Sequence, residues 1–166
     1  AHGSGPGVGW LLLAPIAALL LVAPPTLGSY GVGRGAAVDV RAGARAFAPL
    51  PAAEGPVPMT LLEFGQRAFD HGGATLDGAA VQLTGFVAAS TRGGFQLARY
   101  QIACCAADAA AVVVRVVGVD GSPPPRDAWV TVTGSLGPAG TDDDGDIPVL
   151  AATSVVEIPT PDDPYE

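Results

Sequence analysis

The first part of the chain is continuously apolar, whereas the later part alternates between apolar and polar side chains. Residues 8–23 (VGWLLLAPIAALLLVA) carry no charge, and residues 24–27 extend this run toward the roughly 20 residues that cross a bilayer. Trp10 and Tyr30 lie near its opposite ends, as aromatic anchors at membrane interfaces do. The pattern therefore predicts a transmembrane helix over about residues 8–27.

Two other interpretations of this apolar run stay open. A secretory signal peptide is also short and apolar, but it normally carries Lys or Arg before the apolar core. This chain has neither at that place, where only His2 is found. A helix buried in a globular core is the second alternative, although a helix that is apolar on every side needs a larger protein to cover it.

A linker and a short helix are expected next. Residues 34–58 are rich in Gly, Ala, Pro and Arg and follow no period, which is typical of a linker. Residues 60–69 (TLLEFGQRAF) have an amphipathic pattern, with Thr60 as the N-cap and Glu63 three residues later. This spacing is that of a capping box, so it predicts a short helix.

From residue 79 onward the apolar period changes to two, which is typical of strands with one buried face. Turn clusters of Gly, Pro and Asp separate five strand-like runs, which lie in residues 79–87, 95–99, 111–119, 129–133 and 149–158. Five strands and one helix predict a small OB-like antiparallel β-barrel, and an open sandwich is the alternative.

The expected fold class is therefore mainly β, with a transmembrane helix followed by the OB-like barrel. Residues 1–33 are expected to hold the helix and its flanks, residues 34–58 the linker, and residues 59–166 the barrel domain.

The charge balance is acidic and limits the partners. The chain has eight arginines, no lysine and sixteen acids, for a net charge of −8. From residue 51 onward five arginines stand against fifteen acids. Because a nucleic-acid partner normally requires a basic face, this balance argues against one. An acidic surface instead concentrates cations weakly.

The two cysteines of the chain are adjacent, at Cys104 and Cys105, and Asp108 follows three residues later. Two thiolates and a carboxylate, with His71 as a further candidate, are ligands suited to zinc or another divalent metal ion. A turn is needed to aim both sulfurs at one ion, because neighbouring side chains of a strand point to opposite faces. The predicted metal ligands are Cys104, Cys105 and Asp108.

Two other interpretations of the cysteine pair stay open. In the first, the pair forms a vicinal disulfide, whose strain makes it easy to reduce, and serves as a redox switch. In the second, both cysteines are small buried hydrophobic residues, and Asp108 braces the turn through backbone hydrogen bonds.

The remaining candidates are weaker. Residues 142–146 (DDDGD) lack the glutamate that closes a calcium loop, so a hairpin turn is expected there. His71, before two glycines, is expected to end the helix. Trp129 is expected in the core.

Two further classes of site receive little support from the sequence. Phe86, Phe95 and Tyr100 have no basic neighbours that would make them a stacking surface for single strands. No Gly-rich phosphate loop, GxSxG or Ser-His-Asp arrangement occurs, so no catalytic residue is predicted and a non-enzymatic function is expected.

Four segments resemble one family. They are LTGFV (83–87), FQLARYQIACCAADA (95–109), WVTVTG (129–134) and IPVLAATSVVEIPTP (147–161). Together with the apolar run, they resemble the bacterial YcgQ-type permease-subunit family over roughly residues 9–166, and the cysteine segment is the most specific part.

The resemblance implies a role and a place. Members of this family are membrane proteins with further N-terminal spans and a C-terminal OB-like domain outside the cytoplasm, and a polytopic membrane permease is their expected partner. By that pattern the chain is the last span and extracytoplasmic domain of a longer protein in the bacterial cell membrane. Arg34, Arg41 and Arg45 after the span favour the opposite orientation, with the C-terminal part in the cytoplasm. The orientation implied by the resemblance, with the domain outside the cytoplasm, is nevertheless the expected one.

The expected function is that of a membrane-anchored accessory subunit of a permease, in contact with the lipid bilayer, whose OB-like domain binds a metal ion. The alternatives are a thiol/disulfide redox protein that uses Cys104 and Cys105, and a ligand-binding OB module.

Overall fold

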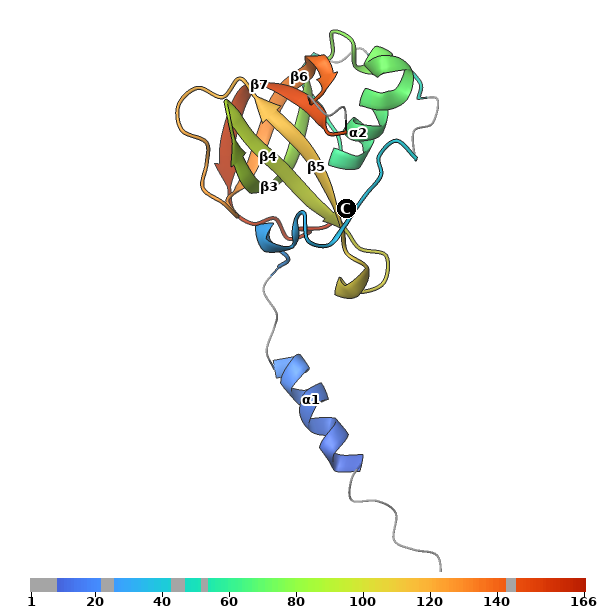
Figure 1. The fold of residues 1–166 in the computed structure, drawn as a ribbon, viewed down its shortest axis with the longest axis vertical. Helices are drawn as coiled ribbons and strands as arrows, with labels where there is room; N and C mark the ends of the chain where they lie inside the picture. Colours follow the sequence, from blue (N-terminus) through green and yellow to red (C-terminus); the bar gives the residue numbers. More distant parts are fainter. Residues whose placement is uncertain (1–8, 22–25, 43–46, 52–53, 143–145) are drawn as a thin grey trace, which may run out of the picture.

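The computed structural model describes residues 9–21, 26–42, 47–51, 54–142 and 146–166 (Figure 1). Its centre is one mixed sheet of seven strands. Six of them follow the order β1-β5-β4-β3-β6-β7, and the seventh, β2, pairs with β3. The five long strands are β3 (Val81–Thr91), β4 (Gly94–Gln101), β5 (Ala110–Val117), β6 (Trp129–Thr141) and β7 (Pro148–Ile158).

The long strands form where the sequence alternates, and they are joined mainly by antiparallel pairing. β3 pairs with β4 and β6, β4 with β5, and β6 with β7, each antiparallel. The register of β6 against β7 shifts between Thr133 and Gly134. A side chain at Gly134 would meet the carbonyl oxygen of Ala151, so the close approach of the two strands there requires glycine.

Three parallel pairings make the sheet mixed. β1 (Ala36–Ala37) pairs with β5, and β2 (Val57–Pro58) pairs with β3. β5 also pairs with β7 over three residue pairs, from Arg115–Val149 to Val117–Ala151. The predicted small antiparallel OB-like barrel is therefore wrong, because strands distant in the sequence join this sheet in parallel. Alternation within a strand carries no information on that pairing.

The predicted transmembrane helix is also wrong. The apolar run forms α1 (Gly9–Leu21), a helix of 13 residues with Pro15 inside it. Thirteen residues rise about 20 Å, whereas the hydrocarbon core is about 30 Å thick. Among the described residues, no helix is both long enough and apolar enough to cross a membrane. Residues 8 and 22–25, which the prediction included, lie outside the described part of the chain.

The segment that follows is fixed to the sheet domain. Ser29 opens the 3-10 helix η1 (Ser29–Gly31) and is buried. Its N–H and its hydroxyl both donate to the Asp127 carboxylate, at 2.6 and 3.1 Å. In the segment expected as a linker, β1 and β2 join the sheet and Val40 belongs to the core.

The predicted short helix is present as α2 (Leu61–Phe69), with Thr60 as its N-cap. The Thr60 hydroxyl accepts the N–H of Glu63 at 3.0 Å. The Glu166 carboxylate accepts two more free N–H groups of the first turn, those of Leu61 at 2.8 Å and Leu62 at 3.2 Å. Thr60 and Glu166, which are far apart in the sequence, therefore both satisfy N–H groups at the N-terminus of α2.

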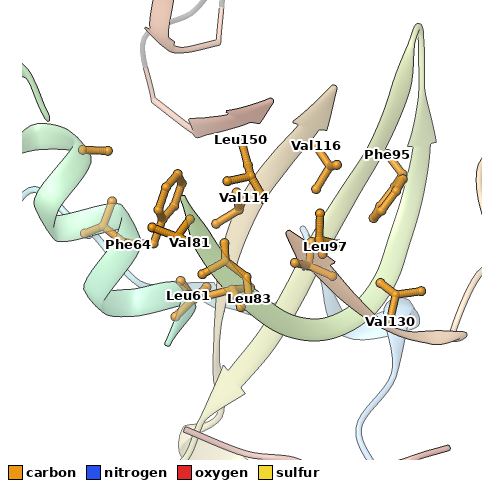
Figure 2. Packing of buried hydrophobic residues seen from close by; sticks show 14 of the residues in the cluster. Leu61, Phe64, Val81, Leu83, Phe95, Leu97, Val114, Val116, Val130 and Leu150 are labelled. Atoms are coloured by element: carbon orange, nitrogen blue, oxygen red, sulfur yellow. The ribbon is translucent and has the colours of Figure 1, made fainter. Parts of the chain in front are cut away.

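The core lies between α2 and the strands (Figure 2). Leu61 and Phe64 of α2 are fully buried in a cluster that contains side chains from every long strand, namely Val81, Leu83, Phe95, Leu97, Val114, Val116, Val130 and Leu150. A second buried cluster contains Phe86, whose ring is stacked on Tyr100 and edge-on to Trp129, each at a centroid distance of 5.7 Å.

Candidate functional site

The two cysteines lie in the loop between β4 and β5, which projects beyond the sheet (Figure 1). The loop contains the 3-10 helix η3 (Ala106–Asp108). Residues 103–108 are exposed, and both cysteines are free thiols. The interpretation of the pair as small buried hydrophobic residues is therefore wrong.

The loop brings the two sulfurs together. The Sγ atoms of Cys104 and Cys105 lie 3.8 Å apart. In a regular strand the two side chains would point to opposite faces, but both residues lie outside β4 and β5. The turn that a shared ligand requires is thus present.

Asp108 holds this turn in place. Its Oδ2 accepts the N–H of Cys104 at 2.8 Å, and its Oδ1 accepts those of Ala103 and Cys105 at 3.3 and 3.4 Å. The Asp108 N–H in turn donates to the Cys105 carbonyl at 3.1 Å. Asp108 therefore braces the loop, because its carboxylate is directed at three backbone N–H groups.

The same carboxylate keeps the neighbouring thiol protonated. The hydrogen bond to Asp108, and then the one to Cys105, raises the pKa of the Cys104 thiol. The hydrogen bond from the Cys104 thiol lowers the pKa of Asp108 most, burial opposes it, and the backbone N–H groups lower this pKa further. A neutral thiol is a weak nucleophile, whereas a metal ion can displace the proton when it binds.

The described residues offer this pair no further ligands. Among them, no group of three or more His, Cys, Asp or Glu side chains is arranged to hold a metal ion. His71, the further candidate, follows α2 and pairs with Asp70 instead. Whether Cys104, Cys105 and Asp108 bind a metal stays a prediction.

His71 has a geometry that the sequence analysis missed. Its Nδ1 lies 2.6 Å from Oδ1 of Asp70, whose other oxygen accepts the Phe47 N–H at 3.1 Å. That N–H, and then His71, lowers the pKa of Asp70, although burial opposes them. Asp70 is only 7% exposed.

The backbone around His71 is left-handed. The φ angle is 49° at His71, and it is also positive at the two glycines that follow. A positive φ at a residue other than glycine is uncommon, and the two following glycines were the only sequence signal of such a turn. The turn borders a hollow of about 670 Å³ that Ser135, Leu136 and Gly137 of β6 also line.

The other candidate sites, which are the acidic turn and the aromatic residues, have structural roles as far as the structure describes them. Asp142 Oδ1 accepts the N–H groups of Asp146 and Ile147, both at 3.0 Å, as in a turn, while residues 143–145 lie outside the description. Phe86, Phe95 and Tyr100 are buried, so they form no exposed stacking surface, and Trp129 is in the core as predicted.

The comparison with known families matches residues 71–166 to the DUF1980 C-terminal domain. The chain belongs to this family. The match spans β3 to β7 and includes Cys104, Cys105 and Asp108. The match gives the family of the C-terminal part of the chain and contains no information on transport, so the permease-subunit role stays a prediction. No curated protein and no solved structure matches the chain.

Proposed function

We propose that this protein is a non-enzymatic accessory module that binds a thiophilic divalent metal ion, such as zinc, at Cys104 and Cys105 for a transport partner. The observation that carries the proposal is the separation of 3.8 Å between the two Sγ atoms. Zinc binds thiolates at about 2.3 Å in tetrahedral geometry, which places two sulfurs of one site about 3.8 Å apart.

The loop around the thiols supports the same conclusion. Asp108 fixes the backbone of Ala103, Cys104 and Cys105 through three hydrogen bonds, so the two sulfurs are positioned before an ion arrives. A ligand set that is ordered in advance loses less entropy on binding. The Asp108 carboxylate also adds a negative charge beside the site, which favours a cation.

A disulfide is the second candidate function, because the two free thiols are adjacent and exposed. The covalent geometry makes it less favourable. Cα atoms across a trans peptide lie about 3.8 Å apart, whereas disulfide-bonded residues usually have Cα atoms about 4.4–6.8 Å apart. A disulfide bond between Cys104 and Cys105 would strain the peptide between them. A metal ion bound to both Sγ atoms at their present separation of 3.8 Å would not.

The transport partner is proposed from two features. The YcgQ-type resemblance implies a polytopic permease, and α1 has apolar side chains available for contact with such a partner. Leu13, Ile16 and Leu21 are exposed at 48%, 52% and 85%, and exposed apolar surface of this kind is typical of interaction sites. We place the domain at the outer face of the bacterial cell membrane, held there by that permease.

Zinc titration of the purified full chain tests the metal-binding part. We expect binding by the wild-type protein under reducing conditions and its loss in Cys104→Ser and Cys105→Ser. Ser90→Ala is the matched control, since Ser90 is exposed on β3 and pairs with Phe95, at the end of β4 away from the cysteine loop. Zinc binding that persists after both cysteines are replaced would refute the proposal.

Intact mass after mild oxidation tests the second candidate. A loss of two hydrogen atoms by the wild-type chain, absent from either serine variant, would show that the disulfide forms. If the oxidised chain keeps its full mass, the redox function is excluded.

The transport role has its own test. We expect a polytopic permease to be recovered with the full chain after mild crosslinking in the native membrane, and replacement of Leu13 and Ile16 by Ser to reduce that recovery. Recovery of no polytopic membrane protein would contradict the accessory role, whatever the metal titration gives.

A further inference from the structure

We infer that the Cys104–Cys105 pair is one half of a metal site, and that a second copy of this chain supplies the other half. One tetrahedral ion would then join two copies through four thiolates. The inference rests on the proposed metal binding and adds the partner that completes the site.

The cysteine pair supplies only half of the ligands that a closed zinc site requires. A structural zinc site is closed by four protein ligands, most often Cys and His. The loop offers two sulfurs at the separation of one edge of such a tetrahedron. Two positions on the ion remain for ligands from elsewhere.

The described part of the chain has no group to fill those positions. Among the residues that the structure describes, no group of three or more His, Cys, Asp or Glu side chains could hold a metal ion. Both oxygens of Asp108 already accept backbone N–H groups. His71 is directed at Asp70.

The cysteine loop is accessible to a second copy of the chain. The loop projects from the sheet domain (Figure 1), and residues 103–108 are all exposed. Two copies can therefore meet at their loops without rearrangement of either sheet. Most homo-oligomers are dimers with a two-fold axis, in which the same patch of both copies makes the contact. An axis through the ion gives both copies an identical pair of sulfurs.

The charges of the thiolates and of the two chains affect how strongly two copies associate. Each thiol gives its proton to solvent, and four thiolates around a divalent ion form a complex with two negative charges. Each chain also has a net charge of −8, and the two Asp108 carboxylates approach each other. Because salt screens repulsion between exposed like charges, we expect the zinc-linked dimer to become stronger as ionic strength increases.

Native mass spectrometry of the full chain in a mild detergent, with zinc added in steps, tests the inference. The detergent covers α1, whose apolar side chains would otherwise associate without metal. We expect a dimer with one zinc ion per two chains, which returns to monomer with a chelator. Cys104→Ser and Cys105→Ser should remain monomeric at every zinc concentration, and Ser90→Ala should behave as wild type.

The outcomes separate the two proposals. A monomer that holds one zinc ion would overturn the shared site and leave the proposed metal binding intact. A chain that binds no zinc would overturn both. Circular dichroism of each variant without metal shows whether its fold is unchanged, and a serine variant that still dimerises with zinc would also overturn the inference.

Discussion

The two ends of the sheet domain are held by different forces. At one end α2 buries Leu61 and Phe64 completely in a hydrophobic cluster that contains side chains from all five long strands. At the other end the β4–β5 loop is exposed over residues 103–108, and the Asp108 hydrogen bonds hold its turn. The hydrophobic effect therefore stabilises the fold at α2, whereas polar contacts shape the loop without adding to the core.

This difference separates stability from function. A change at the α2 end should affect folding and leave the thiols unaffected, because it does not alter the loop. A change in the loop should affect metal binding and leave folding nearly unaffected, because exposed residues contribute little to stability.

Replacement of Phe64 by alanine should have the largest effect. The side chain is fully buried, and its removal leaves a cavity that costs about 3–5 kcal/mol in the free energy of unfolding. Urea denaturation checks this value, with Gln66→Ala on the partly exposed face of α2 as the control. A loss below about 1 kcal/mol would show that α2 does not anchor the core.

Replacement of Cys104 by serine should weaken zinc binding by at least about 100-fold, since a thiolate ligand contributes a large share of the binding free energy of a zinc site. The urea midpoint should stay the same, because the side chain is exposed. Competition with a chromophoric chelator measures the affinity. An unchanged affinity would place the metal elsewhere.

Replacement of Asp108 by asparagine should weaken zinc binding about tenfold, as the loss of a residue that positions ligands typically does. The variant keeps one oxygen as an acceptor but loses the charge and one of the two oxygens that hold the loop. Asp120→Asn is the matched control, because Asp120 is exposed beyond the far end of β5. Equal effects of the two changes would mean that only net charge matters.

The smallest effect is a dependence of stability on pH through Asp70. Its pKa is lowered in the folded state by the Phe47 N–H and His71, so its contribution is present above the unfolded pKa of about 3.9 and is lost as pH falls below it. Denaturation at neutral and at acidic pH should show a smaller acid loss in Asp70→Asn than in wild type. The same acid loss in both would exclude this role for Asp70.

The local structure of the sheet was accessible from the sequence, because alternation of buried and exposed side chains is a property of each strand. All five predicted strands and the helix capped by Thr60 are present. The parallel pairs that join β1, β2 and β7 to other strands were not predictable. They depend on contacts between segments far apart in the chain. The alternation of side chains within one strand does not show which other strand it pairs with.

The candidate site was predictable in its residues and only partly in its geometry. The adjacent cysteines and Asp108 were evident, but the convergence of the sulfurs depends on hydrogen bonds from Asp108 to three N–H groups. The extent of α1 was overestimated, because hydropathy alone does not fix where a helix ends. The His71 turn was missed, because only its two following glycines signal a left-handed backbone.

X-ray absorption at the zinc edge of the zinc-loaded full chain shows directly whether the cysteine sulfurs bind the ion. We expect sulfur neighbours of zinc at about 2.3 Å, which disappear when Cys104 and Cys105 are both replaced by serine. A spectrum of bound zinc with only oxygen and nitrogen neighbours would contradict binding at the cysteine pair.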